Sequence, residues 1–79
     1  MTFPYPLTFN FDGRAWIERF DSPNPLNEGF AELVFKARVD EFKPRKAFCT
    51  VWADVEAENA VGVWDYDAER GTVVWDEDH

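Results

Sequence analysis

The chain has 79 residues, with 8 Lys+Arg against 16 Asp+Glu and a formal net charge of -8. A chain of this length forms one domain, expected here to span 1–79, and it leaves little room for an enclosed catalytic cavity. The aromatic content of 18% supplies enough apolar surface for a dense core, which excludes an intrinsically disordered chain despite the charge.

The single cysteine and the N-terminal residues bear on the cellular location. One cysteine, Cys49, allows no internal disulfide, which fits a reducing compartment. The N-terminal stretch lacks a basic segment and contains Pro4 and Pro6, which argues against a signal peptide, and no apolar run is long enough to cross a membrane. The net negative charge repels nucleic-acid phosphates and anionic lipids. We therefore expect a cytoplasmic protein with no direct nucleic-acid or membrane partner.

The N-terminal residues predict a hairpin. Apolar and polar residues alternate over 6–11, and the Asp12-Gly13 pair that follows is among the strongest two-residue hairpin signals. We expect this strand to pair with an aromatic strand over 14–20. The segment 21–25 combines Asp, Ser, Asn and two prolines, so it ends the second strand.

The segment 29–42 fits two structures. Its apolar residues alternate with polar ones except at Val34, and a period of two is typical of a strand. Glu32 and Lys36 are also spaced by four, and the segment is rich in Ala, Glu, Leu, Lys and Arg, which are good helix formers. We favour a strand here and keep one helix near 26–42 as the alternative.

The second half of the chain predicts an antiparallel meander. Apolar residues occupy the odd positions over 47–57, which indicates a long strand with one buried face. Strands over 61–66 and 72–76 follow, joined by a turn in which Gly71 provides a positive φ, and Gly62 marks a candidate bulge. The predicted fold class is a small β-rich domain with an antiparallel sheet of five or six strands, or an α+β fold if the ambiguous segment is helical.

Residue types needed for catalysis are scarce. Nucleophilic catalysis pairs Ser, Thr or Cys with a base, but the single histidine, His79, is the last residue, where chain ends fray. Cys49 lies on the apolar face of a predicted strand and is expected to be an inert core thiol. The sequence contains no glycine-rich phosphate loop. We expect a protein that is not an enzyme and needs no cofactor.

A calcium-binding loop is the remaining candidate for ion chemistry. Asp65, Asp67, Glu69 and Asp76 fall at positions 1, 3, 5 and 12 of an EF-hand-like frame. Position 6 is Arg70 instead of glycine, and position 12 lacks the bidentate Glu, so the match is poor. A calcium-dependent binding domain is therefore the third functional alternative, and no metal ligands are assigned.

The excess negative charge belongs to the C-terminal third of the chain. Residues 1–53 contain seven acidic and seven basic residues, whereas 54–79 contain nine acidic residues and one basic residue, Arg70. Many of the nine are spaced by two, which places carboxylates on one side of a strand about 6.7 Å apart. The predicted partner-binding residues are these nine: Asp54, Glu56, Glu58, Asp65, Asp67, Glu69, Asp76, Glu77 and Asp78.

An array of carboxylates without interspersed bases predicts a basic partner surface. Duplex DNA also presents closely spaced negative charges, so such an array would compete with DNA for a positively charged groove. Trp64, Tyr66 and Trp75 lie beside the acids and are candidate aromatic anchors, with core packing as the alternative. The competing hypothesis is a small accessory interaction module with an aromatic working surface, whose acids serve solubility.

A basic cluster in the middle of the chain gives a second candidate contact. It surrounds a Lys-Pro-Arg-Lys turn and consists of Lys36, Arg38, Lys43, Arg45 and Lys46. The overall charge of -8 opposes nucleic-acid binding there, and a solvated turn is the simpler interpretation. Pairing of this cluster with the acids of a second copy would give a weak homodimer, so we expect a monomer or a weak homodimer.

The profile resembles that of small acidic phage-encoded inhibitors, in particular anti-CRISPR proteins that mimic DNA. The resemblance lies in the size, the acidic β-rich make-up, the lack of catalytic residues, and the acidic runs 54–58, 65–69 and 76–78. It involves no family motif, so no functional residue is transferred by position. The resemblance implies a non-enzymatic inhibitor that occupies the DNA-binding channel of a CRISPR surveillance or effector complex in the host cytoplasm.

Overall fold

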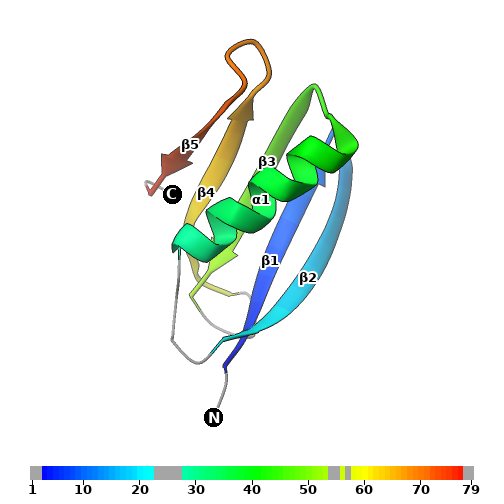
Figure 1. The fold of residues 1–79 in the computed structure, drawn as a ribbon. Helices are drawn as coiled ribbons and strands as arrows, with labels where there is room; N and C mark the ends of the chain where they lie inside the picture. The colour runs from blue at the N-terminus through cyan, green and yellow to red at the C-terminus, as the bar shows by residue number, and fades with distance from the viewer. Residues whose placement is uncertain (1–2, 23–27, 54–55, 57, 78–79) are drawn as a thin grey trace.

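The computed structural model describes residues 3–22, 28–53, 56 and 58–77. These residues form an antiparallel sheet of five strands in the order β2-β1-β3-β4-β5, with one helix lying across one of its faces (Figure 1). The elements are β1 (Phe3–Phe11), β2 (Arg14–Ser22), α1 (Glu28–Phe42), β3 (Lys46–Trp52), β4 (Ala60–Asp67) and β5 (Thr72–Asp76). The predicted β-rich domain is therefore confirmed, in its α+β form.

The first two strands form the predicted hairpin, and both are longer than expected. Phe11 pairs with Arg14, and the turn residues Asp12 and Gly13 have φ angles of 53° and 89°. Glycine adopts such angles without strain, and aspartate adopts them more readily than most residues. Two successive left-handed residues give a turn whose twist matches that of the strands, which is why Asp-Gly fixes this register.

The Asp12 side chain joins this turn to the start of β3. Its carboxylate accepts hydrogen bonds from the backbone N–H groups of Arg45 and Lys46, at 3.1 and 2.9 Å. The backbone N–H of Asp12 donates to the carbonyl oxygen of Lys46 at 2.8 Å. These hydrogen bonds hold the β1–β2 turn against the segment that leaves the helix.

The strand favoured for 29–42 is wrong, because this segment is α1. The buried residues Ala31, Phe35 and Val39 are spaced by four, so they form one stripe on a helix. Leu33, which a strand would have buried with them, is 68% exposed. The alternation of apolar residues in the sequence therefore did not define the buried face.

The local signals for a helix are satisfied in the structure. Glu32 and Lys36 form an ion pair one helical turn apart, with 3.6 Å between Oε2 and Nζ. At the C-terminus of α1, Lys43 has a φ of 48° and donates its backbone N–H to the carbonyl oxygen of Val39 at 2.8 Å. A left-handed residue in this position is a common way to end a helix, and Pro44 follows it.

The hydrophobic core lies between α1 and the face of the sheet that it covers. Three elements contribute three residues each: Leu7, Phe9 and Phe11 from β1, Ala31, Phe35 and Val39 from α1, and Ala47, Cys49 and Val51 from β3. Phe9 pairs with Cys49 in the register of the sheet, so the two strands present their apolar residues to the helix together. Trp16 of β2 and Trp64 of β4 pack against this core from either side.

β3, β4 and β5 form the predicted antiparallel meander, but β3 is shorter than predicted. The strand expected over 47–57 ends at Trp52. Opposite its end, Gly62 pairs with Val51 and Ala60 with Trp52, so one residue of β4 is unmatched. The bulge predicted near Gly62 is thus confirmed.

A three-residue network ties β2 to α1. Nη2 and Nε of Arg38 donate to the two carboxylate oxygens of Glu18 at 2.8 and 3.0 Å, and the indole N–H of Trp16 donates to the same carboxylate at 2.8 Å. The hydrogen bond from Arg38 is the main reason why the pKa of Glu18 lies below its ordinary value. Paired hydrogen bonds between two charged groups are among the stronger ones in proteins, so this network holds α1 against the outer strand.

The replacement Gly62→Ala is expected to lower the free energy of unfolding by about 1–3 kcal/mol. A Cβ at this position would lie 2.5 Å from Cζ2 of Trp75 and 2.7 Å from the carbonyl oxygen of Asp76, so the indole ring and the β5 backbone must both move. Chemical denaturation measures the change. Gly29→Ala, at an exposed position of α1, is the control and should leave stability unchanged or raise it. Equal losses in both variants would contradict the packing explanation.

The Glu18–Arg38 pair predicts a pH dependence of stability. Because the pKa of Glu18 is lower in the folded chain than its ordinary value of 4.5, its contribution is fully present above that value and is lost as the pH falls through the lower folded pKa. At neutral pH the wild type should be more stable than Glu18→Gln by about 1–2 kcal/mol, and in acid this difference should vanish. Denaturation of both chains across the pH range measures it. A difference that is the same at every pH would show that the charge contributes nothing.

Candidate protein-binding surface

The nine predicted partner-binding residues do not form a single array. Asp54 and Asp78 lie outside the described residues. Of the other seven, three lie in β4 and β5 and four lie in turns or beyond the strands. The strand residues are Asp65, Asp67 and Asp76, and the others are Glu56, Glu58, Glu69 and Glu77.

Asp65, Asp67 and Asp76 share the face of the sheet that α1 leaves open, because the alternate residues of β4 and β5 pack against the core. Asp67 lies about 6.7 Å from Asp65 along β4. Asp65 pairs with Val74, so Asp76, two residues further on, is its diagonal neighbour at roughly 7–8 Å. The predicted strand-like spacing of carboxylates therefore holds for these three residues.

Asp67 and Asp65 differ in their surroundings. Oδ1 of Asp67 accepts the backbone N–H groups of Glu69 and Arg70 at 3.0 and 3.3 Å, and Oδ2 lies 3.7 Å from Nε of Arg70. Asp67 thereby stabilises the β4–β5 turn, in which Gly71 has a φ of 68°. Asp65 is exposed, and no described residue forms a hydrogen bond or ion pair with it. Of the two carboxylates, Asp65 is the one available to a partner.

The acids of the β3–β4 connection lie at the other end of the sheet from Glu69. The strand expected to align them ends at Trp52, and Glu56 lies in a turn, so the strand geometry predicted for this run is wrong. The two ends of β4 are about 23 Å apart at 3.3 Å per residue. Because β5 runs antiparallel to β4, Glu77 lies at the same end as Glu58. Glu56 and Glu58 therefore lie beyond one end of β4 and Glu69 beyond the other, while Asp65, Asp67 and Asp76 lie along the strands between them.

The open face of the sheet is apolar at its centre. Phe48, Thr50 and Trp52 alternate with the buried residues of β3 and so face away from α1. Thr50 pairs with Thr8 on one side and with Val63 on the other. The indole N–H of Trp52 donates a hydrogen bond to the hydroxyl of Thr8, which holds the ring over the neighbouring strand.

The outer strands each add an exposed aliphatic residue to this open face. Ile17 of β2 is 41% exposed, and Val74 of β5 is 57% exposed. Within the described part of the chain, neither a helix nor a second sheet covers this face (Figure 1). An apolar centre with carboxylates along its β4–β5 side is a composition typical of protein-binding surfaces.

The three aromatic residues considered as anchors face the other way. Trp64, Tyr66 and Trp75 pack against the core on the helix side, as the alternative interpretation predicted, and the ring centroids of the two tryptophans are 5.0 Å apart. Phe48 and Trp52 take their place on the open face. The signal for these two in the sequence was their alternation with the buried residues of β3.

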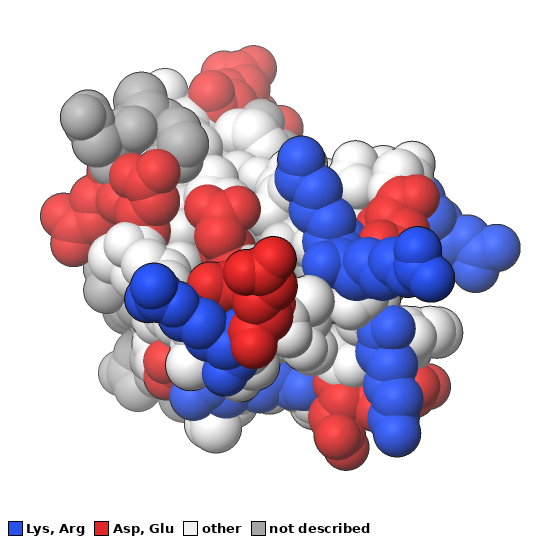
Figure 2. All heavy atoms as spheres, turned by 90° about the horizontal axis from the view of Figure 1, so that it is seen from above, with Lys and Arg blue, Asp and Glu red and all other residues white. Residues whose placement is uncertain are grey.

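The end of the molecule that carries the hairpin turns is mixed in charge. Basic and acidic side chains both occur there when the molecule is seen from above (Figure 2). Lys43 and Arg45 lie in the α1–β3 turn, and Lys46 pairs with Asp67 in the sheet. Arg38, which the sequence grouped with them, is held in the ion pair with β2. The predicted basic cluster is therefore divided and lies beside the acids of the β4–β5 turn.

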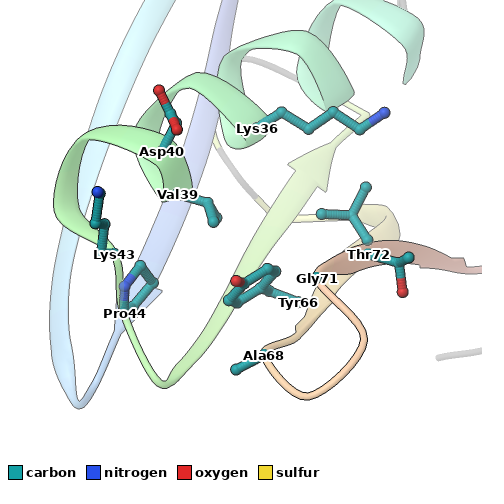
Figure 3. A pocket seen from close by; sticks show the side chains of 10 residues that line it. Lys36, Val39, Asp40, Lys43, Pro44, Tyr66, Ala68, Gly71 and Thr72 are labelled. Atoms are coloured by element: carbon teal, nitrogen blue, oxygen red, sulfur yellow. The ribbon is translucent and has the colours of Figure 1, made fainter.

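A groove of 810 Å³ lies between the C-terminal half of α1 and the β4–β5 hairpin (Figure 3). Val39 of α1 and Tyr66 of β4 line its apolar part. Lys36, Lys43 and Asp40 are its charged residues, so the lining is net positive. None of the seven predicted partner-binding residues that the structure describes lines this groove, and it would repel rather than attract a basic partner.

The residues considered for catalytic or metal chemistry are Cys49, His79 and the acids of the EF-hand-like frame. Cys49 is fully buried, and burial raises its pKa to about 12, which confirms the predicted inert core thiol. His79 lies outside the described residues. In the described ranges, no group of three or more His, Cys, Asp or Glu residues is placed to hold a metal ion. The EF-hand-like frame over 65–76 forms a β-hairpin instead of a loop between two helices.

Comparisons with family models, with curated proteins and with solved structures found no match to this chain. In the part of the chain that the structure describes, no helix has both the length and the apolar character that a membrane span requires.

Two single substitutions should distinguish a structural carboxylate from an available one. Asp67→Ala is expected to lower the free energy of unfolding by about 1 kcal/mol, because two backbone N–H groups and Arg70 lose their acceptor. Asp65→Ala removes an exposed charge without a described partner and should change stability by less than about 0.5 kcal/mol. Chemical denaturation of both variants measures these changes. Equal losses would mean that the turn does not depend on Asp67.

Proposed function

We propose that this chain is a non-enzymatic inhibitor that binds a basic, nucleic-acid-binding surface of a partner protein and thereby competes with DNA. The observation that carries the proposal is the distribution of charge. The segment 54–79 holds nine acidic residues and one basic residue, and its strands align Asp65, Asp67 and Asp76 on one exposed face. Like charges on neighbouring strands repel one another and lower stability. A partner of opposite charge would offset this repulsion, which is why the arrangement favours a binding role.

The carboxylates alone would be a weak substitute for DNA. The three aligned groups span about 14 Å, over which duplex DNA presents about eight phosphate charges. The apolar centre of the open face adds binding energy that the carboxylates do not provide. A partner that contacts the acids can also bury apolar surface against Phe48 and Trp52. The proposed binding surface therefore comprises both the acidic β4–β5 side and this apolar centre.

The resemblance to DNA-mimicking anti-CRISPR proteins suggests the class of partner. A CRISPR surveillance or effector complex holds its target DNA in a positively charged channel, which fits an acidic ligand of this size. The proposed setting is the cytoplasm of a host cell into which a phage delivers the gene.

A second candidate function is supported by the open face itself. Ile17, Val74, Phe48 and Trp52 offer an apolar surface that could serve an accessory interaction module without any role for charge. The two functions differ in salt dependence. Binding by the acids should weaken steeply as salt is raised, whereas binding by the apolar face alone should be nearly indifferent.

The test of the proposed function is competition with target DNA on purified CRISPR surveillance and effector complexes, measured by electrophoretic mobility shift. The double variant Asp65→Asn/Glu77→Gln should inhibit DNA binding roughly three- to tenfold less than the wild type at low salt. The reason is that it removes two exposed carboxylates, that of Asp65 on the open face of β4 and that of Glu77 directly after β5.

The matched control is Asp40→Asn/Glu41→Gln, which removes the same charge from exposed positions of α1. It should inhibit as well as the wild type. Equal loss in both variants would show that only total charge matters, and inhibition unchanged in both would refute the acidic surface as the binding site.

A further inference from the structure

β5 is an outer strand that has no lysine, proline or glycine to protect its edge. It ends the strand order, so alternate N–H and C=O groups along it have no partner strand among the described residues. Its sequence is Thr-Val-Val-Trp-Asp. The other outer strand, β2, carries four charged residues among nine: Arg14, Glu18, Arg19 and Asp21. Charges of this kind discourage the addition of a strand, so β5 is the more receptive edge.

On the open face, β5 combines an exposed apolar residue with nearby carboxylates. Val74 is 57% exposed and pairs with Asp65 of the next strand inward. A strand added beside β5 would lie about 9.6 Å from β4, and a lysine or arginine opposite Val74 is long enough to reach toward Asp65. Its methylene groups would cover Val74 on the way.

On the helix face, β5 offers an apolar wall next to positive charge. Val73 and Trp75 pack at the margin of the core. Val73 also lines the groove whose charged residues are Lys36, Lys43 and Asp40, so a basic side chain on this face would meet a lining of net positive charge. An incoming strand is therefore favoured only if its basic residues face the open side and its apolar residues face the helix side.

The geometry points to β5 as the docking site for an extended segment of a basic partner protein, which adds a sixth strand with alternating basic and apolar residues. Backbone hydrogen bonds to β5 provide affinity, and the two faces provide specificity. A second copy of this chain is the weaker occupant, because each copy carries a charge of -8. The inference rests on the proposed function only for the basic character of the partner.

The probe is a short capped peptide in which lysine and valine alternate, added to the intact, isotope-labelled chain at low salt. Amide hydrogen exchange followed by NMR should show slower exchange at alternate residues of β5 and no change in β2. Val74→Lys should weaken binding of the peptide roughly tenfold, because it puts a like charge where the peptide's lysines pass. Ile17→Lys is the matched control on the other outer strand and should bind the peptide like the wild type.

Four outcomes would overturn the docking site. If the peptide binds but amide exchange in β5 is unchanged, the peptide binds elsewhere. The same follows if Ile17→Lys weakens binding as much as Val74→Lys does. Absence of peptide binding at low salt would exclude strand addition by a basic segment. Protection of β5 in the absence of peptide, together with a dimer in sedimentation, would assign the edge to a second copy. None of these results changes the competition with DNA measured with the Asp65→Asn/Glu77→Gln variant, so failure of the docking site and failure of the proposed function are separable.

Discussion

The packing of one helix against one face of the sheet is the constraint on which the rest of the structure depends. Phe35, fully buried, lies at the centre of this contact, with its ring 5.8 Å from that of Phe11 in an edge-to-face arrangement. A single helix of 15 residues covers only part of one face of a five-stranded sheet. The opposite face and the outer strand β5 are left uncovered in the described part of the chain. The surface available to a partner is thus a consequence of how little helix the chain contains.

Much of the fold could be predicted from local chemistry. Asp12-Gly13 specified its turn because few residue pairs tolerate two successive left-handed φ angles, and the structure has that turn at the predicted residues. The helix could not be distinguished from a strand, because both periods occur in the same segment. The difference lies in Leu33, whose exposure depends on the position of α1 over the sheet and so on contacts distant in sequence.

The candidate surface was predictable in composition but not in arrangement. A count of charges identified the acidic third of the chain, and strand spacing correctly aligned Asp65 with Asp67. It could not show that β3 stops at Trp52, which separates the acids before β4 from those after it by the length of that strand. Nor could it show that the carboxylate of Asp67 accepts hydrogen bonds within the β4–β5 turn, since that depends on the position of two backbone N–H groups.

The reactivity of the buried cysteine, Cys49, depends on how often the centre of this sheet opens. Cys49 has no exposed surface and a pKa raised to about 12, so its thiol is shielded both from reagents and from ionisation while the domain is closed. Any modification must then proceed through a state in which α1 has left the sheet or β3 has separated from its neighbours. The rate at which a thiol reagent reacts would therefore measure the free energy of opening at the core of the protein, without any introduced label.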